Sequence, residues 1–152
     1  MSDPQKEIRV QVVHECPAPA ERVWATLVDW EQHDRWMTLT RAHGGAGTGA
    51  RVLAFTGVGP VGFHDPMEIT GWQPPADGEP GYCEVAHHGR IVRGRGRFDI
   101  VPLTDGRSKI TWTEWVLPPL GGLGRAGWPL AEPALTFFFA RSLRALGERA
   151  RG

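Results

Sequence analysis

Apolar residues recur along this chain with two different periods, which divide it into strands and helices. From Ile8 to Cys16, residues alternate between an apolar face and a polar one, as in a half-buried strand. Five later segments read in the same way: 51–57, 66–72, 82–88, 91–101 and 109–117. Gly89-Arg90 predicts a tight hairpin between two of these strands, and Asp105-Gly106 predicts a turn. This spacing predicts a run of antiparallel strands.

The period changes to that of a helix in two places. Between Ala20 and Trp36 the apolar residues follow helical spacing, and Asp29 can begin a second short helix within this stretch. The tail from about Leu130 to Arg149 predicts a long helix, with Pro133 in its first turn. Its apolar stripe consists of Leu135, Phe138, Phe139, Ser142, Leu143 and Leu146.

These elements predict an α+β fold in one domain spanning residues 1–152. The first strand and the later run of strands predict a curved antiparallel sheet of six to seven strands, with two short helices after the first strand. The C-terminal helix is the only element long enough to cover the concave face. The sheet is therefore expected to wrap around that helix, and a cavity would lie between them.

Composition and charge exclude several partners. Lys and Arg together number 17, as do Asp and Glu, so no charge excess favours nucleic acid. Residues 93–97 read RGRGR, which resembles a nucleic-acid-binding segment. Strand alternation instead places Arg93, Arg95 and Arg97 together on the outer face, and we call them the arginine ladder. Glu84 and Asp99 can pair with it. No apolar run reaches membrane-spanning length and no signal segment is evident, so we expect a cytoplasmic protein without stable membrane insertion. The two cysteines predict buried thiols.

Strand alternation also predicts which side chains face inward. The apolar set is Leu53, Phe55, Met67, Ile69, Val85, Phe98, Ile100 and Trp112, facing Phe138 and Phe139 of the helix. Gly94 and Gly96 add no side chain, which would leave room for a ligand. The alternative is that the same residues pack a dry core.

Four polar residues share the predicted inner face: His14, Asp65, His87 and Glu114. Polar groups buried there need partners, so they indicate either hydrogen-bonded pairs or chemistry. His87 and His88 point to opposite faces of one strand, which disfavours a shared metal ion. We expect no metal and no cofactor, and we expect His87 to lie at the rim of the pocket.

Several motifs in chain order resemble the START-like polyketide cyclase/dehydrase group, also called SRPBCC proteins. They are Pro19-x-x-x-Val23-Trp24-x-x-Leu27-x-Asp29-Trp30, Gly45-x-Gly47-x-Gly49-x-Arg51-Val52, Phe98-x-Ile100-x-Pro102-Leu103 and Arg141-Ser142-Leu143-x-x-Leu146. The resemblance implies a helix-grip fold with an apolar pocket. Members of this group include lipid carriers, aromatic polyketide cyclases, hormone-binding proteins and stress-response regulators, so the fold leaves function open.

The resemblance also implies that the first and last strands pair, which would set His14 close to Glu114. In an apolar pocket, these two residues could act as a general base and its orienting group. The alternative is a satisfied hydrogen-bonded pair, or a His14 at the strand end in water.

Three functions follow from these features. The first is binding of a hydrophobic or aromatic small molecule, lipid- or polyketide-like, by a monomer or homodimer. The second is a polyketide cyclase or dehydratase that uses His14, Glu114 or His87. The third is a regulatory interaction module that uses Trp72 and Trp115 on the outer sheet face. Residues 118–127, rich in Gly and Pro, would form either a lid or a rigid connection.

Overall fold

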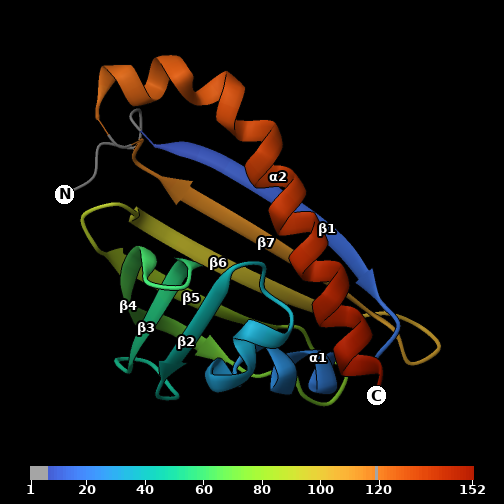
Figure 1. Ribbon diagram of the computed structural model, residues 1–152. Coiled ribbons are helices and arrows are strands. Elements are labelled where there is room, and N and C mark those ends of the chain that lie inside the picture. Colours follow the sequence, from blue (N-terminus) through green and yellow to red (C-terminus); the bar gives the residue numbers. More distant parts are fainter. Residues whose placement is uncertain (1–6, 119) are drawn as a thin grey trace.

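The computed structural model describes residues 7–118 and 120–152, and it contains one antiparallel sheet and one long helix (Figure 1). The strands are β1 (Ile8–Cys16), β2 (Thr40–Gly44), β3 (Arg51–Val58), β4 (Val61–Gln73), β5 (Gly81–His88), β6 (Arg93–Pro102) and β7 (Ser108–Val116). The helices are α1 (Ala20–Leu27), the 3₁₀ helix η1 (Trp30–Arg35) and α2 (Gly122–Arg151). This order and topology confirm the predicted helix-grip fold.

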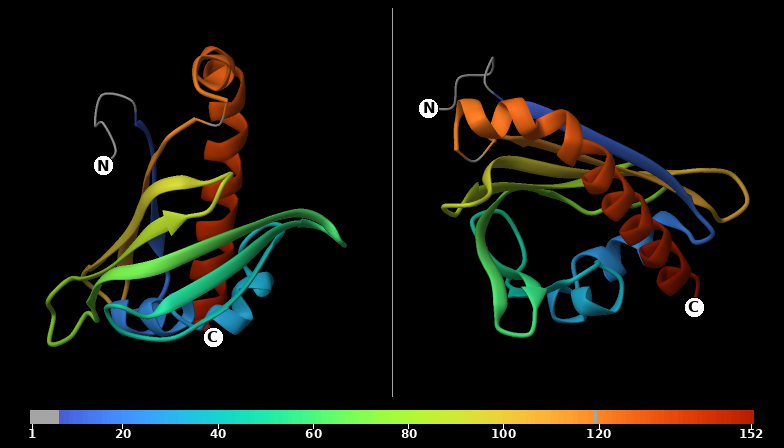
Figure 2. Two further views of the ribbon diagram at one scale, coloured as in Figure 1. Left: turned by 90° about the vertical axis from the view of Figure 1, so that its left-hand side faces the viewer. Right: turned by 45° about the horizontal axis from the view of Figure 1, so that its top comes forward.

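The seven strands are arranged in the order β1-β7-β6-β5-β4-β3-β2. All neighbours are antiparallel, and the first strand closes against the last, as expected. The sheet curves strongly, and α2 lies along its concave side (Figure 2). Strand β2 was not predicted, because four of its five residues are polar or glycine and it pairs only at the sheet edge.

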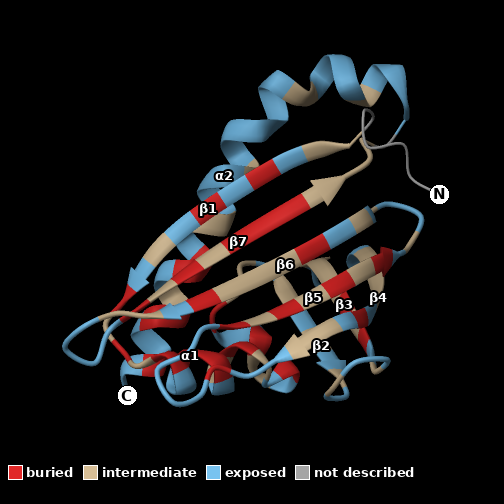
Figure 3. Ribbon diagram, turned by 180° about the vertical axis from the view of Figure 1, so that it is seen from behind, coloured by how far each residue is buried: buried red, intermediate tan, exposed pale blue. Residues whose placement is uncertain are grey.

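A dense core fills one end of this arrangement. The predicted apolar faces of α1 and of the C-terminal part of α2 meet there, with Val23, Leu27, Leu143 and Leu146 fully buried. Figure 3 shows that buried residues concentrate at this end and along the middle strands. Both cysteines lie buried as free thiols, as predicted.

The predicted inward direction of Leu53 and Phe55 is wrong. Val52 and Ala54 are the buried residues of β3, and Val52 lies opposite the inward Met67. Phe55 lies on the other face, where the Arg41 guanidinium covers its ring at 4.7 Å. The larger Leu53 and Phe55 were expected on the inner face, but the smaller Val52 and Ala54 face the core.

Trp72 is also displaced from its predicted position on the outer face. The pairing of β4 with β5 shifts register between Ile69 and Gly71, a β-bulge that reverses the alternation beyond it. Trp72 therefore packs edge-on against Trp24 of α1, with ring centroids 4.9 Å apart. Trp115 alone lies on the outer face, under the Arg95 guanidinium. The predicted pair of exposed tryptophans does not form.

Two boundaries also differ from the prediction. The tight hairpin at Gly89-Arg90 is a four-residue loop, since pairing ends at His88 and Arg93. Helix α2 begins at Gly122, so both Pro129 and Pro133 lie inside it rather than in its first turn. Of the predicted lid, residues 122–127 are therefore helical, and residue 119 lies outside the described residues.

Arg95 and Arg97 of the predicted arginine ladder lie on the outer face of β6, whereas Arg93 borders a pocket at the start of the strand. Arg97 contacts Glu84 at 3.2 Å and Asp99 at 3.0 Å. In the described residues, no helix is long and apolar enough to cross a membrane.

Candidate functional site

A row of polar side chains crosses the concave face from β4 to β7. The two ring nitrogens of His87 each contact a carboxylate, Nδ1 at 2.9 Å from Asp65 Oδ1 and Nε2 at 2.9 Å from Glu114 Oε2. The indole Nε1 of Trp112 donates to the other oxygen of Glu114 at 2.8 Å. We call these four residues (Asp65, His87, Trp112 and Glu114) the polar row.

The missing side chain of Gly96 makes this row possible. Glu114 and Gly96 lie opposite each other on β7 and β6, and His87 lies on the far side of β6. A Cβ at Gly96 would overlap the Glu114 carboxylate, so the carboxylate crosses β6 through space that only glycine leaves. The room predicted at Gly96 is thus occupied by Glu114.

The polar row holds His87 as a cation. Burial by itself would lower the pKa of the imidazole, but hydrogen bonds and charge attraction from Asp65 and Glu114 outweigh it and raise the pKa to about 10. At neutral pH both ring nitrogens therefore donate. As an imidazolium, His87 is a hydrogen-bond donor and charge partner rather than a free base.

An aromatic stack adjoins the polar row. Trp112 is stacked on Phe139 of α2, with centroids 4.0 Å apart and planes 13° apart. Phe98 of β6 lies against Trp112, with a centroid separation of 4.8 Å. The stack joins the sheet to the helix at the point where the helix begins to leave the core.

The predicted meeting of His14 with Glu114 does not occur. In the β1–β7 register His14 lies opposite Ile110, whereas Glu114 lies opposite Val10. Four residues of strand separate the two positions, about 13 Å at ~3.3 Å per residue. His14 lies instead near Gly147 of α2, and burial, together with the charge of Arg144, lowers its pKa.

The remaining predicted residues divide between core and surface. Ile69, Val85, Ile100 and Trp112 are buried, and Met67, Phe98 and Phe139 are partly buried against the same core. Phe138 is exposed and contacts the ring of Phe137, so only Phe139 of the predicted helix pair reaches the sheet. Phe55 borders a small outer pocket of about 270 Å³ together with Leu39 and Arg41.

The first half of α2 does not pack against the sheet. Residues 129–134 are all exposed, whereas Ser142, Leu143, Leu146 and Gly147 are buried. Prolines inside a helix remove backbone hydrogen bonds and bend it, and α2 bends away from the sheet towards its N-terminal end (Figures 1 and 2).

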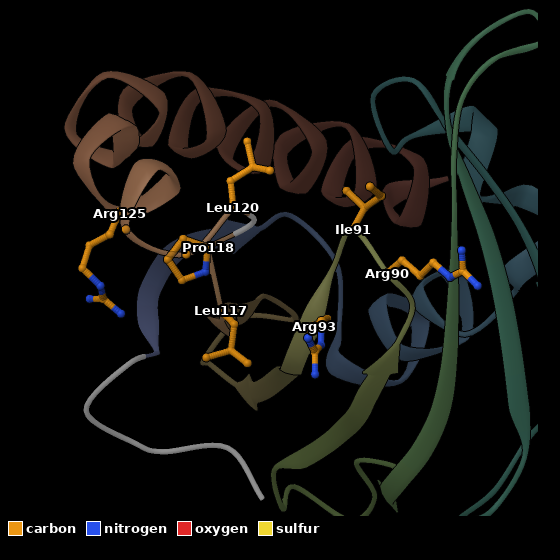
Figure 4. Close-up of a pocket in the computed structure, with 9 residues that line it drawn as sticks. Arg90, Ile91, Arg93, Leu117, Pro118, Leu120 and Arg125 are labelled. Carbon is orange, nitrogen blue, oxygen red and sulfur yellow. The ribbon is translucent and has the colours of Figure 1, made fainter.

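A larger pocket, which we call the mouth pocket, lies at this open end (Figure 4). It has a volume of about 580 Å³ and lies between the β5–β6 loop and the β7–α2 connection. Its apolar lining is Ile91, Leu117, Pro118 and Leu120, and its charged lining is Arg90, Arg93 and Arg125. None of the residues predicted to bind a ligand is among those lining it.

Two features of this site escaped the sequence analysis. His87 was predicted at the pocket rim, but its simultaneous contact with Asp65 and Glu114 depends on strand register. The mouth pocket was missed because its arginines lie in a loop, at a strand start and in a helix. Two sequence signals lay near it: the predicted hairpin at Gly89-Arg90 and the Gly- and Pro-rich segment 118–127, predicted as a lid or a rigid connection.

Several solved structures resemble this fold closely, at low sequence identity. The protein TTHA0849 from Thermus thermophilus superposes with a TM-score of 0.74 at 16% identity, covering 94% of this chain and 97% of that one. The Zhui aromatase/cyclase from Streptomyces sp. R1128 gives a TM-score of 0.66 at 17% identity, with coverages of 95% and 93%. The di-domain ARO/CYC BexL from the BE-7585A biosynthetic pathway gives 0.64 at 12%, covering 93% of this chain and 45% of that chain. These likenesses show the fold.

Curated proteins supply no sequence match. The family model described as polyketide cyclase / dehydrase and lipid transport matches residues 7–151, nearly the whole chain. The protein therefore belongs to the polyketide cyclase / dehydrase and lipid transport family.

Proposed function

We propose that this protein binds a hydrophobic or aromatic small molecule between the concave face of the sheet and the first half of α2. The observation that carries the proposal is the stack of Phe98, Trp112 and Phe139 beside the polar row. Flat aromatic faces supply large contact area, and a few fixed polar groups orient a ligand among them. The family, whose description includes lipid transport, supports the same function.

The exposed first half of α2 supports this location. Leu123 and Leu130 of this segment are 79% and 88% exposed. A ligand lying between this segment and the stack would remove apolar surface from water. Each buried CH₂ group contributes roughly 0.8 kcal/mol.

A neutral aromatic dye tests the proposal. N-phenyl-1-naphthylamine should bind with a rise in dye fluorescence, and Phe139→Ala should weaken that binding at least about fivefold, because the stack loses its helix-side ring. Phe55→Ala is the matched control, since Phe55 lies on the outer face of the sheet under the Arg41 guanidinium and away from the stack. Absence of dye binding to the folded wild type, or equal effects of both variants, would contradict the proposal.

The second candidate is a polyketide cyclase or dehydratase. The likeness to the Zhui aromatase/cyclase favours it, as does the polar row itself. Ring closure of a poly-keto chain needs a base to take a proton from a CH₂ group between two carbonyls. The new carbon–carbon bond leaves an alkoxide that receives a proton in return. Glu114 and Asp65 are the candidate bases, which would take the proton and return it to the alkoxide. The His87 imidazolium, whose two N–H groups already donate to these carboxylates, would hold them in position.

Glu114→Gln separates the carrier from the enzyme. If the protein is a cyclase, turnover of a poly-β-ketoacyl thioester should fall by about 10²-fold or more while dye affinity changes little. His14→Ala should leave turnover intact, because His14 lies opposite Ile110 and away from the row. Product formation by the wild type that is unaffected by Glu114→Gln and by Asp65→Asn would overturn the cyclase assignment to this row.

A further inference from the structure

The mouth pocket has an unusual charge balance for an apolar site. Its described lining includes three arginines, Arg90, Arg93 and Arg125, and no acidic residue. We propose that this pocket binds the anionic group of an amphipathic ligand, a carboxylate or a comparable oxyanion. The inference rests on the proposed function and deepens it by naming the class of ligand.

The neighbouring arginines show why Arg90 and Arg93 stand out. Arg97 is held by Glu84 and Asp99, and Arg95 lies over the Trp115 ring at 3.9 Å. Among the described residues, neither Arg90 nor Arg93 has an acidic partner within ion-pair distance, and both are exposed. Guanidinium groups of this kind form paired hydrogen bonds with carboxylates and phosphates.

The apolar part of the pocket fits the body of such a ligand. Ile91, Leu117, Pro118 and Leu120 surround the space in Figure 4, and Arg93 lies beside it. The side chains of Arg90 and Arg125 extend outward on its two sides. Leu120 is 82% exposed and has a φ of 64°, a left-handed conformation that is strained for a leucine. Strained backbone conformations of this kind cluster at active sites and ligand contacts.

The interior charges favour one ligand orientation. The polar row lies at the same end of the sheet, since His87 is three residues before Arg90 and Glu114 is three before Leu117. In the row, two acidic side chains flank one cation, so an anion would be repelled from it. The anionic group should therefore stay at the arginines while the neutral body points towards Trp112 and Phe139.

Two dyes with the same aromatic skeleton test this inference. 8-Anilinonaphthalene-1-sulfonate carries a sulfonate, and N-phenyl-1-naphthylamine does not. The sulfonate should bind about tenfold more tightly at low salt, since each exposed arginine contributes a factor of roughly 1.5–5. The advantage should shrink between about 20 and 200 mM salt because screening weakens exposed charge pairs.

The double variant Arg90→Gln/Arg93→Gln should lower the affinity of the sulfonate about five- to tenfold and leave the neutral dye within about twofold. The matched control is Arg107→Gln/Lys109→Gln, which removes two positive charges at the β6–β7 turn, at the other end of β6. Near-UV circular dichroism should show native packing in every variant.

The outcomes separate the two proposals. If the neutral dye binds and the sulfonate binds no more tightly, or if the mouth and control variants behave alike, the anion site is overturned and the apolar site stands. If neither dye binds to the folded protein, both are overturned.

Discussion

At the scale of single residues, His87 is held at both of its ring nitrogens. Its ring is buried between two carboxylates, and Gly96 leaves the space that lets Glu114 reach it. Removing one member of a buried charge cluster costs more than the cluster itself contributes, because the remaining charges lose their partner. Single substitutions in the polar row should therefore destabilise the fold.

The stability cost of replacing His87 should depend on pH in a defined way. The folded-state pKa of about 10 exceeds the ordinary 6.5, so the contribution of the cation is complete below pH 6.5 and is lost as pH rises through about 10. His87→Gln should lower the free energy of unfolding by about 3–5 kcal/mol at pH 6, and by less at pH 10. Urea unfolding of both proteins at pH 6, 8 and 10 measures this difference.

His88→Gln is the control for this experiment. His88 contacts Glu68 on the outer face at 3.5 Å, and both side chains are about half exposed. Its loss should change the free energy of unfolding by less than about 1 kcal/mol at each pH. The free energies of unfolding of the wild type and of His87→Gln could instead differ by the same amount from pH 6 to pH 10. That result would show that His87 is not a cation in the folded protein.

At the scale of elements, the two halves of α2 differ in how they pack. Its C-terminal half contributes Leu143, Leu146 and Ala150 to the core, while the half containing Pro129 and Pro133 is exposed. Helix stability in proteins comes mostly from packing of one face, so the first half has little to hold it. A segment of this kind can move to admit a ligand and then cover it.

Hydrogen exchange should resolve these two halves. Amides of residues 140–150 should exchange at least about tenfold more slowly than those of residues 122–138, because only the former pack against the sheet. Saturation with N-phenyl-1-naphthylamine should slow exchange in the first half if the ligand lies beneath it. Equal protection of both halves in the free protein would mean that the first half is already held by another contact.

At the scale of the whole molecule, the two ends of the sheet serve different purposes. One end is closed by α1, η1 and the C-terminal half of α2 around a dense core (Figure 3). The other end carries the polar row, the aromatic stack and the mouth pocket. Rigid packing at one end thus supports the site at the other end, since binding sites are held in place by a rigid scaffold.

Much of this architecture could be predicted from local patterns. The two-residue and helical periods predicted six of the seven strands and all three helices, since each period reflects burial of one face. The errors concern side-chain direction, and they lie where the inward and outward alternation along a strand is interrupted or is read in the wrong phase. The bulge after Ile69 reversed the direction of Trp72, and the small residues of β3 took the inner face instead of Leu53 and Phe55.

For the site, the sequence by itself determined which residue types face the concave side: His87, Glu114, Asp65, Trp112 and Phe139 are there because strand and helix periods put them there. Only the tertiary structure decided which of them meet. Register between strands is set by long-range pairing and by one bulge, so His14 lies opposite Ile110 while Glu114 reaches across Gly96 to His87. The same holds for the mouth pocket, whose arginines come together only when the ends of separate elements converge.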